Sequence, residues 1–184
     1  MSRTPSREVS AVSADVFPAP GHNHDPCRSS LLERASRLFE AKAKKMTGLR
    51  RRVLEEIAGS HQALGAYEIL ERLAAKGPRL APISVYRAIE ALNEVGLVHR
   101  LESRNAFFAC HASHAPDRNQ LILACERCGR VAEVEGDQVF AALGRAIEQA
   151  AFEPRRTVTE VSGVCAACRP EGGTRDGARH GAGH

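Results

Sequence analysis

Apolar residues recur at helical spacing through the first half of the chain, with charged residues on the opposite faces. Four segments between residues 30 and 96 show this pattern. A segment of alternating polarity then runs over residues 97–111 and contains a polar turn, which predicts a β-hairpin. The expected helix boundaries are Ser30 to about Met46, Thr47 as N-cap to Gly59, Gly65 to Gly77, and Pro82 to Gly96.

Beyond Asn119 the pattern changes from helices to strands. The stretch LILACERCGRVAEVEG predicts two strands around a cysteine turn, and a helix follows over roughly Asp137–Ala150. One more strand is expected in RTVTEVSGV, before CAAC. The predicted fold is therefore an N-terminal winged helix-turn-helix, mainly α with a β-hairpin wing, followed by a small α+β domain.

A chain of 184 residues can form one sizeable core or two small ones, and the change of pattern favours two. The start of the chain is rich in Ser, Pro and Ala, and the end is rich in Gly. We predict a flexible arm over residues 1–28, a winged-helix domain over 29–106, a small α+β domain over 107–169, and a flexible tail over 170–184.

Charge is concentrated in the first folded half. Residues 28–104 hold 15 Lys and Arg against 9 Asp and Glu, a net +6, whereas residues 105–184 and 1–27 are each at −1. A positive charge concentrated in this way is expected of a protein that binds a polyanion. No stretch approaches the roughly 18–20 apolar residues of a membrane helix, and the start lacks the apolar run of a secretory signal. We therefore expect a cytoplasmic protein whose thiols bind metal rather than form disulfides.

The helix that precedes the hairpin is the expected DNA-reading element. In a winged helix-turn-helix this helix enters the major groove, and residues near its N-terminus face the base edges. Here those residues are Ser84, Tyr86 and Arg87. The alternative is that Tyr86 and Arg87 lie on an ordinary solvated face. The element order and the positive charge favour contact with DNA.

Two cysteine pairs, Cys125-x-x-Cys128 and Cys165-x-x-Cys168, each follow an apolar strand-like run. Four thiolates around one tetrahedral ion form a closed, structural zinc site. Thioredoxin-type chemistry would leave the second pair unexplained. A zinc deaminase would need a His-x-Glu and a proline before the knuckle, where Ala124 stands. We expect no enzyme activity and no small organic substrate.

A second group of potential ligands falls where the hairpin leads into the second domain. Its mixed nitrogen, sulfur and oxygen donors suit zinc, while a thiolate disfavours Mn and makes an Fe(II) site less natural. A site at a domain junction closes only in one relative orientation, so metal and DNA binding would be coupled by about 1–3 kcal/mol. The group comprises His99, Cys110, His111, His114, Asp117 and Glu133.

These motifs resemble the ferric uptake regulator family of metal-responsive repressors, most closely its zinc uptake regulator branch, from about Leu31 to Cys168. The stretches that carry the resemblance are GAYEIL, SVYRAIEAL, GLVHRLES, Cys110 followed by His111, CERCG with Glu133 eight residues after Cys125, and CAAC. The resemblance implies a homodimer whose winged domains bind the halves of a palindromic operator in double-stranded DNA. It also implies about two zinc ions per chain, one structural and one regulatory.

The resemblance extends to individual residues. It implies that the four knuckle cysteines hold structural zinc, that His99, Cys110 and Glu133 are sensing ligands, and that Tyr67, Tyr86 and Arg87 contact DNA. To the DNA contacts we add Ser84 and Arg50.

The sequence departs from the family at two places. Where members usually carry a histidine, some seven residues before the first knuckle, this chain has Arg118; we assign His114 as the fourth sensing ligand, with His111 and Asp117 as substitutes. The family's Thr-Pro-x-Arg is Thr47-Gly48-Leu49-Arg50 here, without the proline that pre-sets a helix start.

The sequence thus predicts a zinc-responsive repressor that controls zinc uptake genes. One alternative is a sensor of iron, manganese, nickel or peroxide on the same scaffold. A second is a winged-helix protein with structural zinc only, and a third is an oxidoreductase that cycles Cys125 and Cys128. In the arm, His22, His24 and Cys27 could form an auxiliary clip, but ordering costs about 1–2 kcal/mol per residue, so we expect a weak or absent site.

Overall fold

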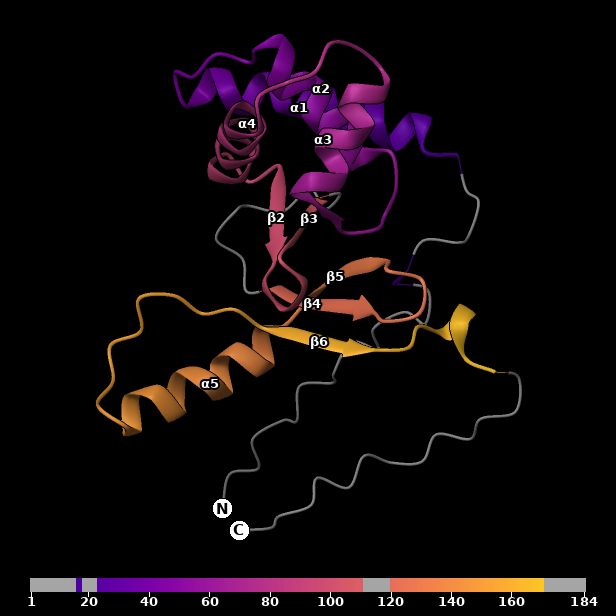
Figure 1. Cartoon of the computed structure of the whole chain (residues 1–184). Helices are drawn as coiled ribbons and strands as arrows, with labels where there is room; N and C mark the ends of the chain where they lie inside the picture. Colours follow the sequence, from indigo (N-terminus) through magenta and orange to yellow (C-terminus); the bar gives the residue numbers. More distant parts are fainter. Residues whose placement is uncertain (1–15, 18–22, 111–119, 171–184) are drawn as a thin grey trace, which may run out of the picture.

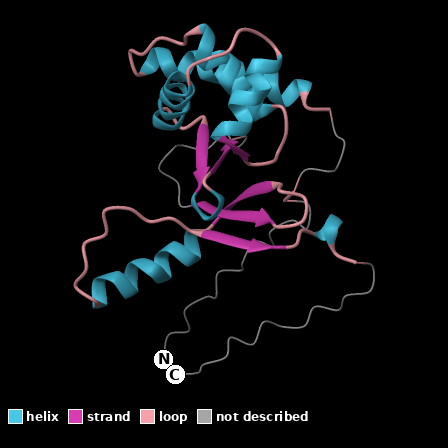
Figure 2. Ribbon diagram, in the orientation of Figure 1, coloured by secondary structure: helices cyan, strands magenta, loops and turns pink. Residues whose placement is uncertain are grey.

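The structure is a computed structural model that describes residues 16–17, 23–110 and 120–170 (Figure 1). A cluster of helices stands above a sheet, and a hairpin runs from the cluster to this sheet (Figure 2). The elements are α1 (Asp25–Ala41), α2 (Gly48–Ala58), β1 (Leu64–Gly65), α3 (Ala66–Ala75), α4 (Pro82–Glu94), β2 (Val98–Leu101), η1 (Glu102–Arg104), β3 (Ala106–Ala109), β4 (Gln120–Cys125), β5 (Val131–Glu135), α5 (Asp137–Gln149), β6 (Glu160–Gly163) and η2 (Ala166–Cys168).

The winged domain is built on a core formed by all four N-terminal helices. Phe39, Ile57, Ile69 and Leu92 are among its fully buried side chains, one from each helix, because the apolar residues at three- and four-residue spacing face inward. The predicted N-cap of α2 is confirmed, since Thr47 Oγ1 accepts a hydrogen bond from the Arg50 N–H at 3.3 Å.

The first helix differs from the prediction at both ends, because it runs from Asp25 to Ala41 rather than from Ser30 to Met46. Its proline lies in the first turn, where the missing N–H costs nothing. Ala43 ends the helix with φ of 51°, and the N–H of Lys44 bonds to the carbonyl of Phe39 at 2.8 Å. The residue in the left-handed position is not a glycine, so the sequence carries no stop signal there.

Two of the predicted boundaries therefore fall inside elements. The arm expected to end at residue 28 gives way to helix at Asp25, and the domain boundary expected after residue 106 lies within β3. The pairing of β3 with β2, Val98 opposite Ala109, keeps the whole hairpin with the winged domain.

The hairpin is confirmed, with Asn105 at φ of 47° closing its turn. A two-residue strand, β1, adds to β3 and gives the order β1-β3-β2. Two residues cannot show a period, so the sequence did not predict β1.

The second sheet has the order β5-β4-β6. Strands β4 and β5 are antiparallel neighbours around the cysteine turn, whereas β6 lies parallel to β4 after a connection through α5. Helix α5 has no buried residue and extends away from the winged domain (Figure 1). Strand β6 is an edge, and α5 exposes Val139 and Leu143.

The hairpin packs on the second sheet. Leu101 and Phe108 of the hairpin share a buried cluster with Ala124 and Val131 of the sheet, and Ile122 packs against it. The Val131 N–H also bonds to the carbonyl of His61 at 2.9 Å. The two domains are thus in direct contact along the wing. Within the described residues, none of the helices combines the length and apolar character needed to cross a membrane.

Candidate metal centres and nucleic-acid interface

The two cysteine pairs meet because their strands are neighbours. Cys125 ends β4 and pairs with Gly163 of β6, so the turn that follows each strand leaves the same end of the sheet. The four sulfurs lie within 4.8 Å of one another, and the sulfurs of Cys128 and Cys165 are 3.8 Å apart. Four ligands at about 2.3 Å from a tetrahedral zinc would be about 3.8 Å apart. The residues present therefore fit zinc.

The electrostatics of the four thiols also suit a cation. Burial opposes ionisation of Cys125, but backbone N–H groups of Cys165, Cys128 and Arg127 bond to its sulfur and lower its pKa to about 6. The pKa of Cys168 rises to about 12, first because of its contact with the Cys165 sulfur. The Cys125 thiol thus ionises easily, while the Cys168 thiol resists ionisation. A bound divalent ion would offset the repulsion among the thiolates.

Arg130 stands beside this cluster, and its guanidinium donates to the sulfur of Cys128 at 3.2 Å and to that of Cys165 at 3.6 Å. Burial opposes ionisation of Cys128, yet the bond from Arg130 lowers the pKa of this thiol. Sequence reasoning missed Arg130; its one signal was a basic residue two positions after a knuckle cysteine. Its positive charge partly balances a site made of four thiolates.

The second candidate centre joins the two domains. His99 comes from β2, Cys110 follows β3, and Glu133 lies in β5. Their ligand atoms lie within 4.8 Å of one another, and His99 Nε2 is 3.3 Å from Glu133 Oε1. Nitrogen and oxygen ligands at about 2.0–2.2 Å from a tetrahedral zinc would be roughly 3.4 Å apart, so the set fits that ion.

The predicted fourth ligand of this centre lies in a part of the chain that the structure does not describe. His114, which the sequence favours, lies outside the described residues, as do His111 and Asp117. Cys110 is buried and the Glu133 side chain is 8% exposed, so these two ligands are shielded from solvent.

The predicted DNA-contacting residues divide into two groups. Tyr67, 71% exposed in the first turn of α3, and Tyr86 and Arg87, exposed on α4, present their side chains to solvent. Ser84, in the first turn of α4, is half-buried. Arg50 is engaged within the protein, because its guanidinium lies 5.3 Å from the Phe39 ring centroid and donates to the carbonyl of Lys45 at 2.5 Å.

One exposed side chain on α4 was missed by sequence reasoning. Ile83 is 58% exposed and precedes Tyr86 by three residues, so the two share a helix face. Its signal was an isoleucine outside the apolar stripe of Val85 and Ile89. An apolar side chain in this position suits contact with a thymine methyl group.

The predicted arm motif is only partly described. His24 is the N-cap residue of α1 and its ring centroid lies 5.0 Å from that of His61, while Cys27 is half-buried in α1. His22 lies outside the described residues. Over residues 23–110 and 120–170, three or more ligand atoms come within 4.8 Å of one another only at the two centres above.

These features define a winged-helix protein with a metal-binding second domain. The chain belongs to the ferric uptake regulator family, whose model matches residues 41–160. It is 33% identical over 138 residues to the zinc uptake regulation protein of Escherichia coli (strain K12), covering 75% of this chain and 81% of that one.

Two of the solved structures that are similar to this chain match it over most of their own length. A zinc uptake regulator complexed with zinc and DNA matches with a TM-score of 0.72 at 32% identity, over 77% of this chain and 94% of that one. Holo XcZur matches with a TM-score of 0.68 at 33% identity, over 77% of this chain and 97% of its own. The similarity thus extends across both domains.

Proposed function

We propose that this chain is a zinc-responsive transcriptional repressor that binds a palindromic operator as a homodimer when its sensing site holds Zn(II), and so controls zinc uptake genes. The observation that carries the proposal is the convergence of His99, Cys110 and Glu133 from two domains to within 4.8 Å. The relatives named as zinc uptake regulators support zinc over the other metals.

The sensing site acts through the relative placement of the domains. Two of its ligands move with the wing hairpin and one with the second sheet, so an ion bound by all three favours one orientation. If DNA binds that orientation best, zinc tightens DNA binding, and DNA tightens zinc binding by the same factor. The four-cysteine centre lies within the second domain alone, and we assign it the structural zinc, which gives about two zinc ions per chain.

A homodimer follows from the surface of the second domain, which we take to run to residue 169. Helix α5 buries none of its residues in the monomer, and Val139, Leu143, Phe152 and Val161 are exposed. An amphipathic helix gains its stability from packing its apolar face, so this surface needs a partner. A second copy would bring two winged domains to the two halves of a palindrome.

Operator recognition is assigned to α4 and its neighbours. Tyr86, Arg87 and Ser84 lie on the N-terminal half of α4, and Tyr67 lies on α3. Lys and Arg contacts to phosphates supply most of the affinity and a steep salt dependence. Arg50 acts mainly by fixing the junction of α1 and α2, since its guanidinium is already engaged there.

The family consists of transcription regulators, and we propose that this chain has no catalytic activity. The proposed place of action is the cytoplasm, where operator DNA is found and where thiols stay reduced.

The deciding experiment is a titration of protein that keeps only its tight zinc with Zn(II), Fe(II) and Mn(II), read by fluorescence anisotropy of a labelled palindrome. We expect Zn(II) to raise affinity most, with uptake of one further ion per chain. A stronger response to Fe(II) or Mn(II) would favour a sibling sensor. Metal-independent binding with a single zinc per chain would favour a protein with structural zinc only.

A further inference from the structure

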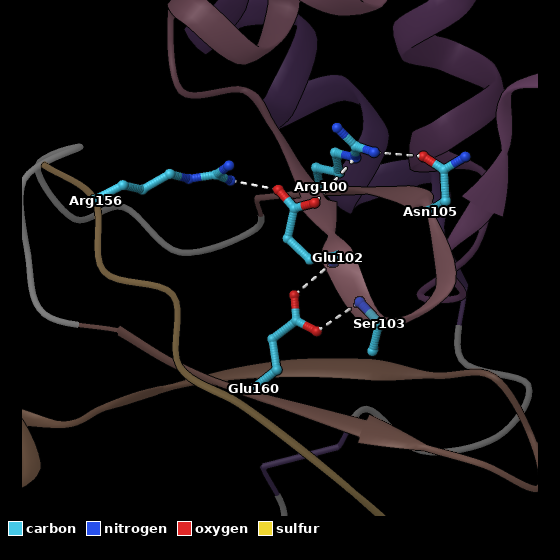
Figure 3. Close-up of polar contacts among 6 residues, drawn as sticks. All are labelled: Arg100, Glu102, Ser103, Asn105, Arg156 and Glu160. Atoms are coloured by element: carbon cyan, nitrogen blue, oxygen red, sulfur yellow. Dashed lines mark hydrogen bonds and ion pairs between the residues drawn. The ribbon is translucent and has the colours of Figure 1, made fainter.

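The tip of the wing is tied to the second domain by a carboxylate from β6. Glu160 Oε1 accepts the Glu102 N–H at 2.6 Å, and Oε2 accepts the Ser103 N–H at 3.0 Å (Figure 3). Arg156, in the loop before β6, pairs with the carboxylate of Glu102 (Figure 3). Arg104 also donates to the Cys125 carbonyl at 3.2 Å. All these contacts cross from the hairpin to the second domain.

The wing tip has backbone N–H groups that this carboxylate can satisfy. The one-turn η1 follows Leu101, which has no side-chain group to cap it, and the first N–H groups of a helical turn lack partners within the turn. Glu160 provides one oxygen for each of two such groups, and bonds of this charge-assisted kind are stronger than neutral ones. Burial raises the pKa of Glu160, but the N–H groups of Glu102 and Ser103 outweigh it and hold the pKa below its usual value.

The second sheet aligns this carboxylate with a ligand of the sensing site. Ile122 of β4 pairs with Glu133 of β5 on one side and with Glu160 of β6 on the other. Residues paired directly across strands point to the same face, so the three side chains form one row toward the hairpin. Adjacent strands are about 4.8 Å apart, which separates the two carboxylate-bearing strands by roughly 10 Å.

Residues of the hairpin, taken in chain order, contact the members of this row one after another. His99 meets Glu133 at 3.3 Å, and Leu101 shares the buried cluster against which Ile122 packs. The next residue, Glu102, meets Glu160. Along this row the wing contacts the second domain at two polar points on either side of an apolar one, and of these two polar points only the one at Glu133 belongs to a metal centre.

Resting on the function proposed above, we propose that Glu160 is a positioning residue that holds the wing tip on the second domain whether or not the sensing site is loaded. Glu160 holds the wing tip together with the apolar contact at Leu101 and the bond from Arg104 to the Cys125 carbonyl. Zinc at His99, Cys110 and Glu133 would add a fixed point at the other end of the row.

We call the contact of Glu160 with Glu102 and Ser103, together with the pair of Arg156 and Glu102, the wing anchor. Because of this anchor, zinc binding selects a single relative orientation of the two domains instead of merely drawing two loosely placed domains together.

The anchor also adjoins the DNA-facing helix. A cleft of about 530 Å³ has Glu102 and Arg156 from the anchor in its walls, together with Tyr86 of α4. A shift of the wing tip would therefore change a cleft that the helix assigned to base reading also lines.

The test compares Glu160→Gln with wild type and with Glu153→Gln, which removes an exposed charge from the loop before β6. The first measurement is amide hydrogen exchange of the peptide spanning the wing tip, on protein that keeps only its tight zinc. We expect slow exchange of the Glu102 and Ser103 amides in wild type and in the control, and loss of that protection in Glu160→Gln. Unprotected amides in wild type until zinc fills the sensing site would overturn the proposal.

The second measurement is the coupling between zinc and operator. In Glu160→Gln we expect the gain in operator affinity on adding zinc, and the sensing-site affinity for zinc, to fall together by about 10-fold, the effect of losing charge-assisted bonds. An unchanged gain would refute the anchor. Loss of the tight zinc or of the helical circular dichroism would assign Glu160 to folding and equally overturn the proposal.

The two measurements separate this inference from the proposed function. If wild type binds operator without any response to zinc, the proposed function fails, while the exchange of the tip amides still reports whether Glu160 holds the wing.

Discussion

The four-cysteine centre and the His99–Cys110–Glu133 centre share a metal preference and differ in what holds them. The first is formed by two turns of one domain, at one end of a single sheet, with four donors of the same kind. The second takes donors of three kinds from a hairpin and from the sheet beneath it. In the proposed function, an ion in the first centre stabilises one domain, whereas an ion in the second centre fixes the relative orientation of the two domains.

Strand β4 contributes to both centres. Strand β4 ends in Cys125 and pairs through Ile122 with the strand that carries Glu133. In the proposed function, the four-cysteine centre therefore holds the sheet that positions Glu133, a proposed sensing ligand. A tight site can keep the scaffold rigid while a weaker, reversible site on the same scaffold responds to zinc supply.

The largest effect is expected when the structural centre is broken. Cys165→Ser should lose the tight zinc and unfold the second domain, because binding of structural zinc contributes on the order of 10 kcal/mol to folding. Zinc content, circular dichroism and sedimentation should show loss of metal, structure and dimer together. Cys27→Ser is the matched control and should retain all three. A Cys165→Ser variant that stays folded and dimeric without tight zinc would remove the distinction between the two centres.

A smaller and more selective effect is expected at the sensing centre. Cys110→Ala should keep the fold and the tight zinc but lose the gain in operator affinity on adding zinc, up to about 3 kcal/mol or roughly 150-fold. Anisotropy titrations with and without added zinc measure this gain. Cys27→Ala should behave as wild type. Survival of the gain in Cys110→Ala would show that this cluster is not the sensor.

A third change tests DNA reading apart from both metal centres. Arg87→Ala should weaken operator binding by about 2 kcal/mol, roughly 30-fold, and relax discrimination among operator variants, since a bidentate arginine–guanine contact is worth about that much. Zinc uptake at both centres should be unchanged. Arg37→Ala removes another exposed arginine of the same domain and should not alter sequence preference. Equal losses of operator affinity in the two variants would show that Arg87 contributes positive charge and not sequence discrimination.

The smallest effect concerns pH and separates the sensing centre from the wing anchor. The pKa of Glu160 lies below its usual 4.5. Its contribution to holding the wing tip is therefore complete above pH 4.5 and is lost only as the pH falls through the lowered pKa. Protons compete with zinc for nitrogen and thiolate donors, so sensing-site affinity should fall between pH 7 and about pH 5.5. Chelator competition measures this fall. Exchange of the wing-tip amides, corrected for its intrinsic pH dependence, should stay constant over the same range.

Much of the fold could be predicted because its signals are local. Thr47 and Gly96 mark helix ends by their own capping and backbone preferences, and the apolar spacing identifies the buried faces. The helix end at Ala43 was not predictable in this way, since an alanine in the left-handed region is held there by its surroundings. The short strand β1 exists only because β3 lies beside it.

The candidate site was predictable as a set of donors and not as a geometry. The density of His, Cys, Asp and Glu near the junction indicated a group of six donors, and the family resemblance singled out His99, Cys110 and Glu133, which the structure brings together. The position of Arg130 two residues after Cys128 does not by itself show that its guanidinium would contact two of the knuckle sulfurs. Spacing alone also gave no sign that the Arg50 guanidinium would lie near Phe39.

By itself, the sequence determined the order of elements, the buried faces and the two knuckles, because each depends on residues a few positions apart. Only the tertiary structure placed β6 parallel to β4 and so set Glu133, Ile122 and Glu160 in one row beneath the wing. Strand register is fixed by contacts between segments distant in the chain, and no local pattern encodes it. The row that relates the sensing ligand to the wing anchor is therefore a property of the fold.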